Sequence, residues 1–409
     1  MIYGITLSLA WRNLWRQPWR TWLTVVAMVF SNTLLVFMVS LQFGMYRLMY
    51  ENSLNMFHGH LQVQAEGYLD EPWMRFSVPG IAALASDLRT AVPEARVSAR
   101  ASAFVLVSSA DRSYGVQLIG VQPDFEPAVS TLPGLIKAGR WLSGTAPEAV
   151  IGSVLARNLK VQPGDELTFF GSGRDGSFAA AVATVVGVFD SGAADIDRSL
   201  IEIPLAAFQD IFSMDGHGHS VVISMPDVFD LDPAKAAIRQ SIDDAGLVLH
   251  HWDALQPGLR QTVQADMVGS WFMYAVLIAL VAFSVLNTQL MSVLDRTREF
   301  GIVMALGLKP GRLGRLLLFE TAIMAGLGLL LGVALGVAVV LYFQVYGFSY
   351  PGLEEAAARF NLPGRIYPSA SFASVILGPL VVFAACLAAA VYPIAKLLRM
   401  QPVAAMQAA

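Results

Sequence analysis

The sequence predicts an α-helical membrane protein with four transmembrane helices and a large α+β domain outside the membrane. The chain of 409 residues is 55% hydrophobic and 14% charged, with a mean hydropathy of +0.56. Soluble domains carry roughly 25% charged residues, so this composition favours a membrane protein. Runs that lack charge and can cross about 30 Å of hydrocarbon occupy residues 22–41, 267–294, 321–346 and 370–392. More than 200 residues of ordinary soluble composition separate the first run from the second.

The positions of the basic residues predict how these segments are arranged across the membrane. Lys and Arg gather before the first span and again between residues 296 and 315, and the positive-inside rule places such segments in the cytoplasm. Both termini are therefore expected inside. The predicted segments are a cytoplasmic amphipathic helix at 1–21, transmembrane helices at 22–45, 267–294, 317–346 and 370–392, an extracytoplasmic domain at 46–266, a cytoplasmic loop at 295–316, an outer loop at 347–369 and a cytoplasmic tail at 393–409.

Two similar strand, helix and strand patterns flank the middle of the large domain. The first consists of HLQVQA, IAALASDLRTA and VSARASAFVLVSS, and the second of SVVISM, DPAKAAIRQSIDDAG and LVLHHW. Residues from about 121 to 214 are rich in glycine, proline and short β-rich runs, which is typical of strands joined by turns. We therefore predict a split β-α-β subdomain that contains an inserted, mostly β subdomain.

The same domain is acidic, because residues 46–266 hold 15 Lys and Arg against 26 Asp and Glu. An acidic surface argues against nucleic-acid binding. The only cysteine, Cys386, lies in the fourth charge-free run, so the domain is expected to fold without disulfides.

Glycine recurs every fourth residue in the third span, at Gly328, Gly332 and Gly336. This spacing places three positions without side chains on one helix face, where a second helix can approach closely. Packing within one subunit is the favoured interpretation, and a contact between subunits is the alternative.

The segment between the second and third spans carries five basic residues and has the pattern of a short helix from 296 to 306, which Gly307 and the Lys-Pro-Gly at 309–311 interrupt. Charge alone would fit a solvated cytoplasmic loop. The detailed pattern resembles the R-x-R-E-x-G-I-x-x-A-x-G signature of the permease family that includes FtsX, MacB, LolC and LolE. The matching residues are Arg296, Arg298, Glu299, Gly301, Ile302, Ala305 and Gly307.

Further stretches resemble the same family in the same order. The opening AWRNLWRQPWRT is similar to the family's basic amphipathic helix, and the closing YPIAKLLRMQPVAAM is similar to its Tyr-Pro and Pro-Val motifs, with Met406 in the place of leucine. The series at 139–169 resembles the family's Gly-Arg, Val-Ile-Gly, Leu-Ala and Gly-Asp positions. VVGVFDSGAADIDRSLIEIPLAAFQDIF at 185–212 is most similar to the LolC and LolE branch.

The resemblance implies a membrane subunit of a mechanotransmitting ABC transporter in a bacterial inner membrane, with its large domain in the periplasm. Its expected partners are a pair of cytoplasmic ABC ATPase chains that hold ATP and Mg²⁺, a second permease copy or a paralogue, a periplasmic carrier or adaptor, and membrane lipids. By the same resemblance, residues 296–308 form the coupling helix that contacts the ATPase. The residues expected to carry this contact are Arg296, Arg298, Glu299, Phe300, Gly301, Ile302, Met304, Ala305, Gly307 and Leu308.

No catalytic or cofactor-binding residue is predicted in this chain. A P-loop needs a lysine directly after a glycine, and none of the five lysines follows one. ATP is therefore expected on a separate chain, unlike in the fused MacB arrangement. The pairs His58 with His60 and His217 with His219 have a spacing that could hold a metal, but local hydrogen bonding at strand starts is the favoured interpretation, so no metal site is predicted.

The cargo is expected to be a lipoprotein or a lipid-like molecule that the transporter releases from the inner membrane. Flexible and aromatic side chains near the outer ends of the first two spans could line a pocket for acyl chains. The predicted pocket residues are Phe37, Leu41, Met45, Leu48 and Phe272. The alternatives are an FtsX-like regulator of a cell-wall hydrolase and a MacB-like exporter of peptides or antibiotics.

Overall fold

The computed structural model describes residues 2–16, 18–110, 112–228, 230–242, 246–353, 357 and 364–399. The chain forms two compact units. A helical unit holds the chain up to Arg47, the segment Thr262–Tyr350 and the chain from Arg365, and a sheet unit holds Leu48–Gln261 with the short segment before Arg365. Residues 400–409 of the predicted tail, and 354–356 and 358–363 of the predicted outer loop, lie outside the described residues.

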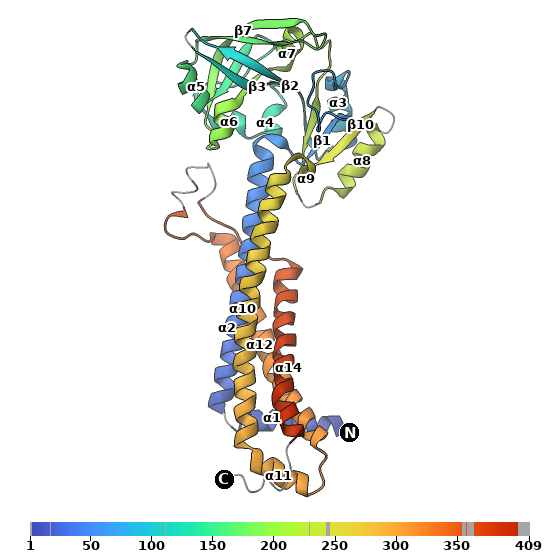
Figure 1. Ribbon diagram of the computed structural model, residues 1–409, viewed down its shortest axis with the longest axis vertical. Helices are drawn as coiled ribbons and strands as arrows, with labels where there is room; N and C mark the ends of the chain where they lie inside the picture. The colour runs from blue at the N-terminus through green and yellow to red at the C-terminus, as the bar shows by residue number, and fades with distance from the viewer. Residues whose placement is uncertain are drawn as a thin grey trace. The chain divides into compact units, whose positions relative to one another are not determined.

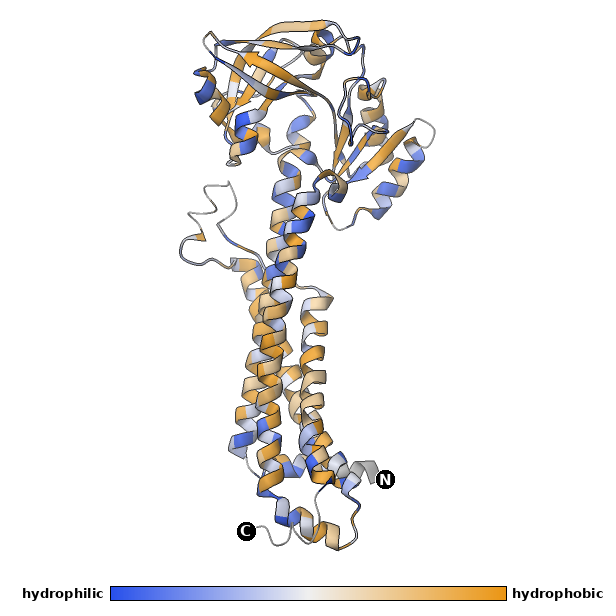
Figure 2. Cartoon of the chain, in the orientation of Figure 1, coloured by the Kyte–Doolittle hydropathy of each residue, from blue (hydrophilic) through white to orange (hydrophobic). Residues whose placement is uncertain are grey.

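Long apolar helices dominate the helical unit, and Figure 2 shows the hydrophobic residues along them in orange. Among the described residues, four helices are long and apolar enough to cross a membrane, as predicted. The helices are α1 (Ile2–Leu14), α2 (Pro18–Ser53), α10 (Pro257–Asp295), α11 (Thr297–Ala305), α12 (Pro310–Tyr346), the π-helix η3 (Ala373–Leu377) and α14 (Gly378–Leu398), as Figure 1 shows.

The helices extend beyond the charge-free runs, because a helix does not have to end where the hydrocarbon ends. The first span was predicted at 22–45 but lies within α2, which continues to Ser53. The third was predicted to begin at residue 317, yet α12 begins at Pro310, where a proline loses no helical hydrogen bond. Gly307 between α11 and α12 has φ of +96°, a conformation that favours glycine, and it lets the chain reverse there.

The glycine series of α12 packs against α2 of the same chain. A Cβ atom added to Gly328 or Gly332 would lie 2.5 Å from the Cβ of Met28 or Asn32, and one added to Gly336 would lie 2.9 Å from the Cβ of Val36. Thr33 adds a hydrogen bond of 3.1 Å from its hydroxyl to the Gly332 carbonyl. Close approach of this kind maximises dispersion contacts and interhelical hydrogen bonding in a membrane, so these glycines pack two helices within one subunit.

The sheet unit contains ten strands in one sheet among its described residues. The strands are β1 (Leu61–Ala65), β2 (Arg96–Ser108), β3 (Ser113–Val121), β4 (Ile136–Gly139), β5 (Glu148–Gly152), β6 (Glu166–Ser172), β7 (Phe178–Phe189), β8 (Leu200–Pro204), β9 (Ser220–Ser224) and β10 (Leu247–His251). The helices are the π-helix η1 (Leu54–His58), α3 (Ile81–Ala91), α4 (Glu126–Val129), the 3₁₀ helix η2 (Leu132–Leu135), α5 (Ser153–Leu159), α6 (Ala194–Ser199), α7 (Leu205–Ile211), α8 (Asp232–Ile242) and α9 (Trp252–Leu255).

The two predicted strand, helix and strand patterns fold together. Their strands lie in the order β10, β1, β9, β2, and every pairing between neighbours is antiparallel. The helices α3 and α8 pack against each other, and their buried residues join the same hydrophobic core as the strands. This β-α-β-β-α-β order is the ferredoxin-like arrangement, built from segments more than 100 residues apart in sequence.

The predicted insertion does not form a subdomain of its own. Strands β2, β3, β8, β5, β7 and β6 pair in succession, and β6 pairs again with β2, so that six strands close into a barrel. Figure 1 shows this barrel beside the ferredoxin-like part. The predicted boundary at residue 121 is not confirmed, because the 13-residue strand β2 belongs to both parts and joins them into one continuous sheet.

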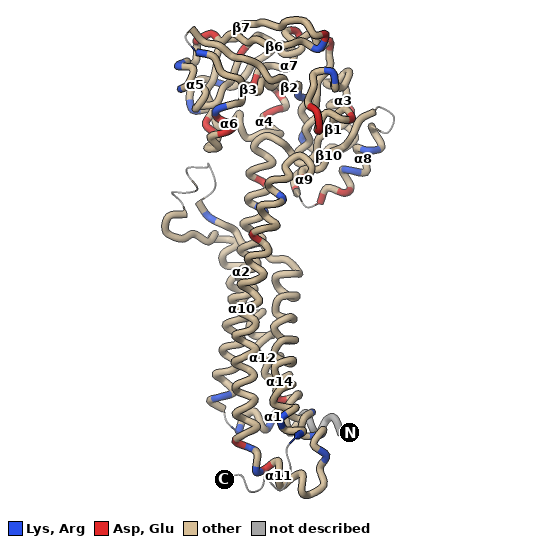
Figure 3. The backbone as a smooth tube through the Cα atoms, in the orientation of Figure 1, with Lys and Arg blue, Asp and Glu red and all other residues tan. Residues whose placement is uncertain are grey.

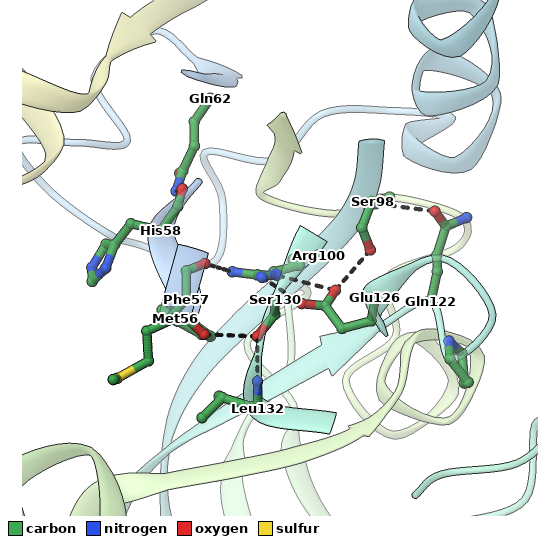
Figure 4. A network of polar contacts seen from close by, with 12 residues as sticks. Met56, Phe57, His58, Gln62, Ser98, Arg100, Gln122, Glu126, Ser130 and Leu132 are labelled. Atoms are coloured by element: carbon green, nitrogen blue, oxygen red, sulfur yellow. Dashed lines mark hydrogen bonds and ion pairs between the residues drawn. The ribbon is translucent and has the colours of Figure 1, made fainter. Parts of the chain in front are cut away.

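A buried ion pair attaches η1, the continuation of the first long helix, to the sheet. The Arg100 guanidinium donates to the Phe57 carbonyl and forms an ion pair with Glu126, both side chains being almost fully buried. The Ser98 hydroxyl donates to Glu126 over 2.8 Å, and the Ser130 hydroxyl donates to the Met56 carbonyl over 2.7 Å. Figure 4 shows Arg100 between these partners. Burial makes each bond costly to break, so η1 is held firmly to the sheet.

A second carboxyl group, Glu202 on β8, is fully buried, and neither of its oxygen atoms has a hydrogen-bond partner among the described residues. Burial, together with the nearby negative charge of Glu126, raises the pKa of Glu202 to about 8. The folded protein therefore keeps this proton at neutral pH, whereas the unfolded chain loses it above about pH 4.5.

We predict that the wild-type protein loses stability as pH rises and that the Glu202→Gln variant does not. The wild-type sheet unit should lose stability between about pH 4.5 and pH 8, because only the unfolded state ionises in that interval. Relative to wild type, the free energy of unfolding of the variant should increase by roughly 3 kcal/mol as the pH rises from 5 to 8. Hydrogen exchange of the β8 amides in the full-length protein measures this difference.

Glu148→Gln serves as the control, since a hydrogen bond from Arg140 lowers the pKa of Glu148 and keeps this carboxylate ionised from pH 5 to pH 8. The stability of this variant relative to wild type should not change between pH 5 and pH 8. An equal response of the two variants would contradict the assignment.

Candidate functional site

A buried carboxylate joins three separate elements at one end of the helical unit. The Glu320 side chain on α12 is only 4% exposed, and its Oε1 accepts from Asn13 Nδ2 of α1 over 2.9 Å and from Arg296 Nη1 over 3.2 Å. Arg296 is the N-cap residue of α11, and its guanidinium lies over the Phe300 ring at 5.0 Å. A buried charge must be paired, so this carboxylate holds α1 and α11 on α12.

Glu299, the first-turn carboxylate of α11, has its partner within the chain. Both of its oxygen atoms accept from Arg16, over 2.9 and 3.1 Å, and Arg296 Nε lies 3.7 Å away. The hydrogen bond from Arg16 lowers the pKa of Glu299 below its usual value. Glu299 and Arg16 are each about half exposed, so this pair contributes less than the buried one.

The helix α11 has two distinct faces. Phe300 and Met304 are buried against residues of α10, α12 and α14, including Val293, Leu317 and Leu397, and Leu308 packs partly against the same cluster. Gly301 is also buried. The exposed residues recur at helical spacing and form a stripe, the α11 stripe, made of Arg298, Glu299, Ile302, Ala305 and Leu306.

The residues predicted to contact the ATPase fall on both faces of α11. Arg298, Glu299, Ile302 and Ala305 lie on the α11 stripe, and Gly307 follows it as an exposed turn residue. Phe300, Gly301 and Met304 instead hold α11 to the helical unit, and Arg296 is bound by Glu320. The seven matching residues of the signature could not separate the faces, because apolar residues occur on both sides of so short a helix. Leu306, which is 83% exposed, was not predicted.

An apolar groove of about 330 Å³ lies at the other end of the spans. Its walls come from α2, α10, η3 and α14, and they contain no Lys or Arg. The lining residues are Leu35, Val39, Gln42, Phe43, Tyr46, Met267, Trp271, Tyr274, Ala275, Ile278, Ala373, Leu377, Gly378 and Val381.

The predicted pocket residues do not line this groove. Phe37 packs on the rings of Phe343 and Phe348, with centroids 5.4 and 5.6 Å apart, and Phe272 is 74% exposed outside the groove. Leu41 and Met45 are likewise absent from its walls, and Leu48 belongs to the sheet unit. Successive helical residues turn by about 100°, so the groove uses positions 35, 39, 42, 43 and 46 of α2, whereas the prediction took the opposite face.

Polar side chains form a network at one end of the groove. The Tyr46 hydroxyl donates to Asp266 Oδ2 over 2.7 Å, and Gln42 Nε2 lies 2.6 Å from the Tyr46 hydroxyl. The Tyr274 hydroxyl donates to Gln42 Oε1 over 2.7 Å, and Gln42 also bonds to Ser270. Gln42 and Tyr46 are polar residues inside a long apolar helix, which is the signal in the sequence that could have identified this face.

One histidine of each pair accepts a hydrogen bond from a backbone N–H that is distant in sequence, and not from its own turn as predicted. His60 Nδ1 accepts from the Met225 N–H over 2.8 Å, and His219 Nδ1 accepts from the Ser102 N–H over 2.9 Å. Burial lowers the pKa of both His60 and His219 to about 4. Among the residues that the structure describes, no three His, Cys, Asp or Glu side chains are grouped to hold a metal ion.

Comparison with known proteins identifies the family. The MacB-like periplasmic core domain matches residues 21–241, and the FtsX-like permease C-terminal region matches residues 271–402. The chain belongs to the FtsX and MacB family of ABC transporter permeases. The motifs at Arg296–Gly307 and along the large domain therefore identified the family correctly. The apolar helices and the periplasmic-type domain fit a bacterial inner-membrane protein.

Several relatives match most of the permease at low identity. The lipoprotein-releasing system transmembrane protein LolC of Xylella fastidiosa strain Temecula1 is 23% identical, over 94% of this chain and 92% of its own. The lipoprotein-releasing system transmembrane protein LolE of Haemophilus influenzae is 23% identical over 73% of each chain. The macrolide export ATP-binding/permease protein MacB of Rhodospirillum rubrum is 24% identical over 99% of this chain and 60% of its own.

A solved structure, the periplasmic region of MacB from Actinobacillus actinomycetemcomitans, covers 52% of the permease and 97% of that chain. The identity is 13% and the TM-score 0.39.

We predict that Glu320→Ala loosens α11. The substitution leaves Arg296 and Asn13 without their buried acceptor, which costs about 3 kcal/mol. Hydrogen exchange of the α11 amides in the full-length permease should accelerate about 100-fold. Glu299→Ala is the matched control, since an exposed ion pair contributes at most about 1 kcal/mol, and exchange should rise less than tenfold. Comparable exchange in the two variants would show that Glu320 does not hold α11.

Proposed function

We propose that this permease converts ATP hydrolysis by a separate cytoplasmic ATPase into a movement of the sheet unit, and thereby releases a lipid-like or lipid-anchored cargo from the inner membrane. The apolar groove carries this proposal. It gives a hydrocarbon chain a place among α2, α10, η3 and α14, and it lies at the end of the spans remote from the α11 stripe.

The proposed orientation rests on charge. Arg12, Arg16 and Arg20 precede or begin the first span, and basic residues surround α11, as the positive-inside rule expects of cytoplasmic segments. Both termini and α11 are then cytoplasmic, with one span before the periplasmic sheet unit and three after it. In this arrangement the groove opens at the level of the outer leaflet.

The α11 stripe is the proposed contact with the ATPase. Ile302 and Leu306 offer exposed apolar side chains one turn apart, and Arg298 and Glu299 add charges of both signs at the start of the helix. An apolar centre beside charged groups suits a specific protein interface. Because the opposite face of α11 is buried on α10, α12 and α14, a push on the stripe displaces the spans together.

The proposed assembly contains two ATPase chains, which hold ATP and Mg²⁺, and a second permease copy or a paralogue. A periplasmic carrier or adaptor takes the released cargo. The relatives named for lipoprotein release, LolC and LolE, support this choice of cargo.

Export of a soluble amphiphile is a second candidate function. The relative named for macrolide export matches 99% of this chain, and an apolar groove with a polar end would also accept a drug-like molecule. The two functions differ in the cargo that leaves the membrane.

We predict that Ala275→Trp, which fills the groove, abolishes cargo release and leaves the ATPase bound. Vesicles that contain the permease and a co-expressed ABC ATPase should release a fluorescent acylated peptide to a soluble acceptor on addition of ATP, and the variant should release at least about tenfold less. Met273→Trp, an exposed position on the same helix outside the groove, is the control and should release normally.

Release by Ala275→Trp at the control rate would remove the groove from the pathway. Release of a macrolide instead of the acylated peptide would favour the export function.

A further inference from the structure

We propose that the groove prefers a phospholipid whose head group carries a primary ammonium, as in phosphatidylethanolamine, over one with an anionic head group. This inference rests on the proposed function in one respect, namely that the groove holds an acyl chain. The selectivity comes from Asp266 and the polar network beside it.

The network holds Asp266 against two residues that line the groove. Tyr46, which is only 6% exposed, donates its hydroxyl hydrogen to Asp266 Oδ2 over 2.7 Å, and Gln42 Nε2 approaches the same oxygen atom at 3.4 Å. Tyr46 and Gln42 are themselves lining residues of the groove. The carboxylate is therefore fixed in relation to the walls by side chains that form them.

Asp266 retains an acceptor for a ligand. Its hydrogen bonds to described residues all end on Oδ2, and its side chain is exposed. A carboxylate has two oxygen atoms and about four acceptor positions, so Oδ1 is available to a donor that approaches along the groove. An ammonium group has three N–H donors and forms the stronger, charge-assisted kind of hydrogen bond with a carboxylate.

The walls give an anionic head group no compensating charge. The lining contains no Lys or Arg. In the adjoining polar network, Asp266 carries a negative charge. A phosphate without an amine would face the carboxylate at short range, where like charges repel. The ammonium of phosphatidylethanolamine interposes a positive charge, and the lining includes the aromatic residues Trp271 and Tyr274, a residue type that attracts cations.

The size of the groove suits one chain of such a lipid. About 330 Å³ is at the lower end of the range for ligand sites, so part of one acyl chain lies inside and the head group remains outside. The chain end is bounded by apolar residues of α14 and η3, such as Val381 and Leu377. This fixes the polarity of the bound lipid, with its head group at Asp266.

The experiment uses the full-length permease reconstituted in vesicles of equal phosphatidylethanolamine and phosphatidylglycerol. After extraction in mild detergent, mass spectrometry counts the lipids of each class that remain bound. Wild type should retain phosphatidylethanolamine in about fivefold excess. Asp266→Asn should retain the same total with a ratio near one, and Asp266→Glu should restore the preference. Asp87→Asn, which removes an exposed carboxylate from α3 of the sheet unit, should match wild type.

The variants separate this inference from the proposed function. If Ala275→Trp loses both lipids while Asp266→Asn keeps the wild-type ratio, the groove is the lipid-binding site but the role of Asp266 is overturned. Unchanged retention of both lipids in Ala275→Trp would overturn the groove itself. Equal retention of the two lipids by wild type would also overturn the preference.

Discussion

The organisation of the end of the helical unit that carries α11 depends on one buried carboxylate. Glu320 lies within an apolar helix, where an unpaired charge would cost several kcal/mol. Its requirement for partners fixes Arg296 at the start of α11 and Asn13 near the end of α1. Elements separated by more than 300 residues in sequence therefore meet at one point, and α11 gains a fixed position on the bundle.

Close packing between helices holds the rest of the helical unit together. Gly328, Gly332 and Gly336 let α12 lie directly on α2, and α11 packs its apolar face on α10, α12 and α14. In the sheet unit, Arg100 and Glu126 attach η1, which continues from α2, to the sheet. Packed interfaces shift between discrete arrangements and deform little in between, which is what the proposed passage of movement along the helices requires.

The sequence was sufficient for the parts of the fold that depend on local pattern. Charge-free runs predicted the four long helices, and the two strand, helix and strand patterns predicted β1, α3, β2, β9, α8 and β10. Closure of the barrel could not be predicted, because the pairing of β6 with β2 joins residues about 60 positions apart and leaves no local pattern. The shared strand β2 likewise concealed that the predicted insertion is continuous with the rest of the sheet.

The predicted site residues lie on the segments that carry the α11 stripe and the groove, but only some of them lie on those two surfaces. The long helix α2 is apolar on all sides, so its hydrophobic pattern does not distinguish Leu35 and Val39, which line the groove, from Phe37 and Leu41, which do not. The few polar residues within the apolar helices indicate which face contacts another helix, whereas the apolar residues do not. Gln42, Tyr46 and Glu320 each stand within an apolar helix, and each proves to be bound to a partner from another helix.

Site-directed crosslinking most directly tests whether α11, held by Glu320, presents its exposed stripe to an ATPase. Single cysteines at Ile302 and Leu306, and at the buried positions Phe300 and Met304, would be introduced into the full-length permease co-expressed with an ABC ATPase. The account predicts that a short bifunctional reagent joins the ATPase to positions 302 and 306 and leaves 300 and 304 unreacted. Crosslinks from 300 and 304, or none from the stripe while the two proteins still assemble, would contradict it.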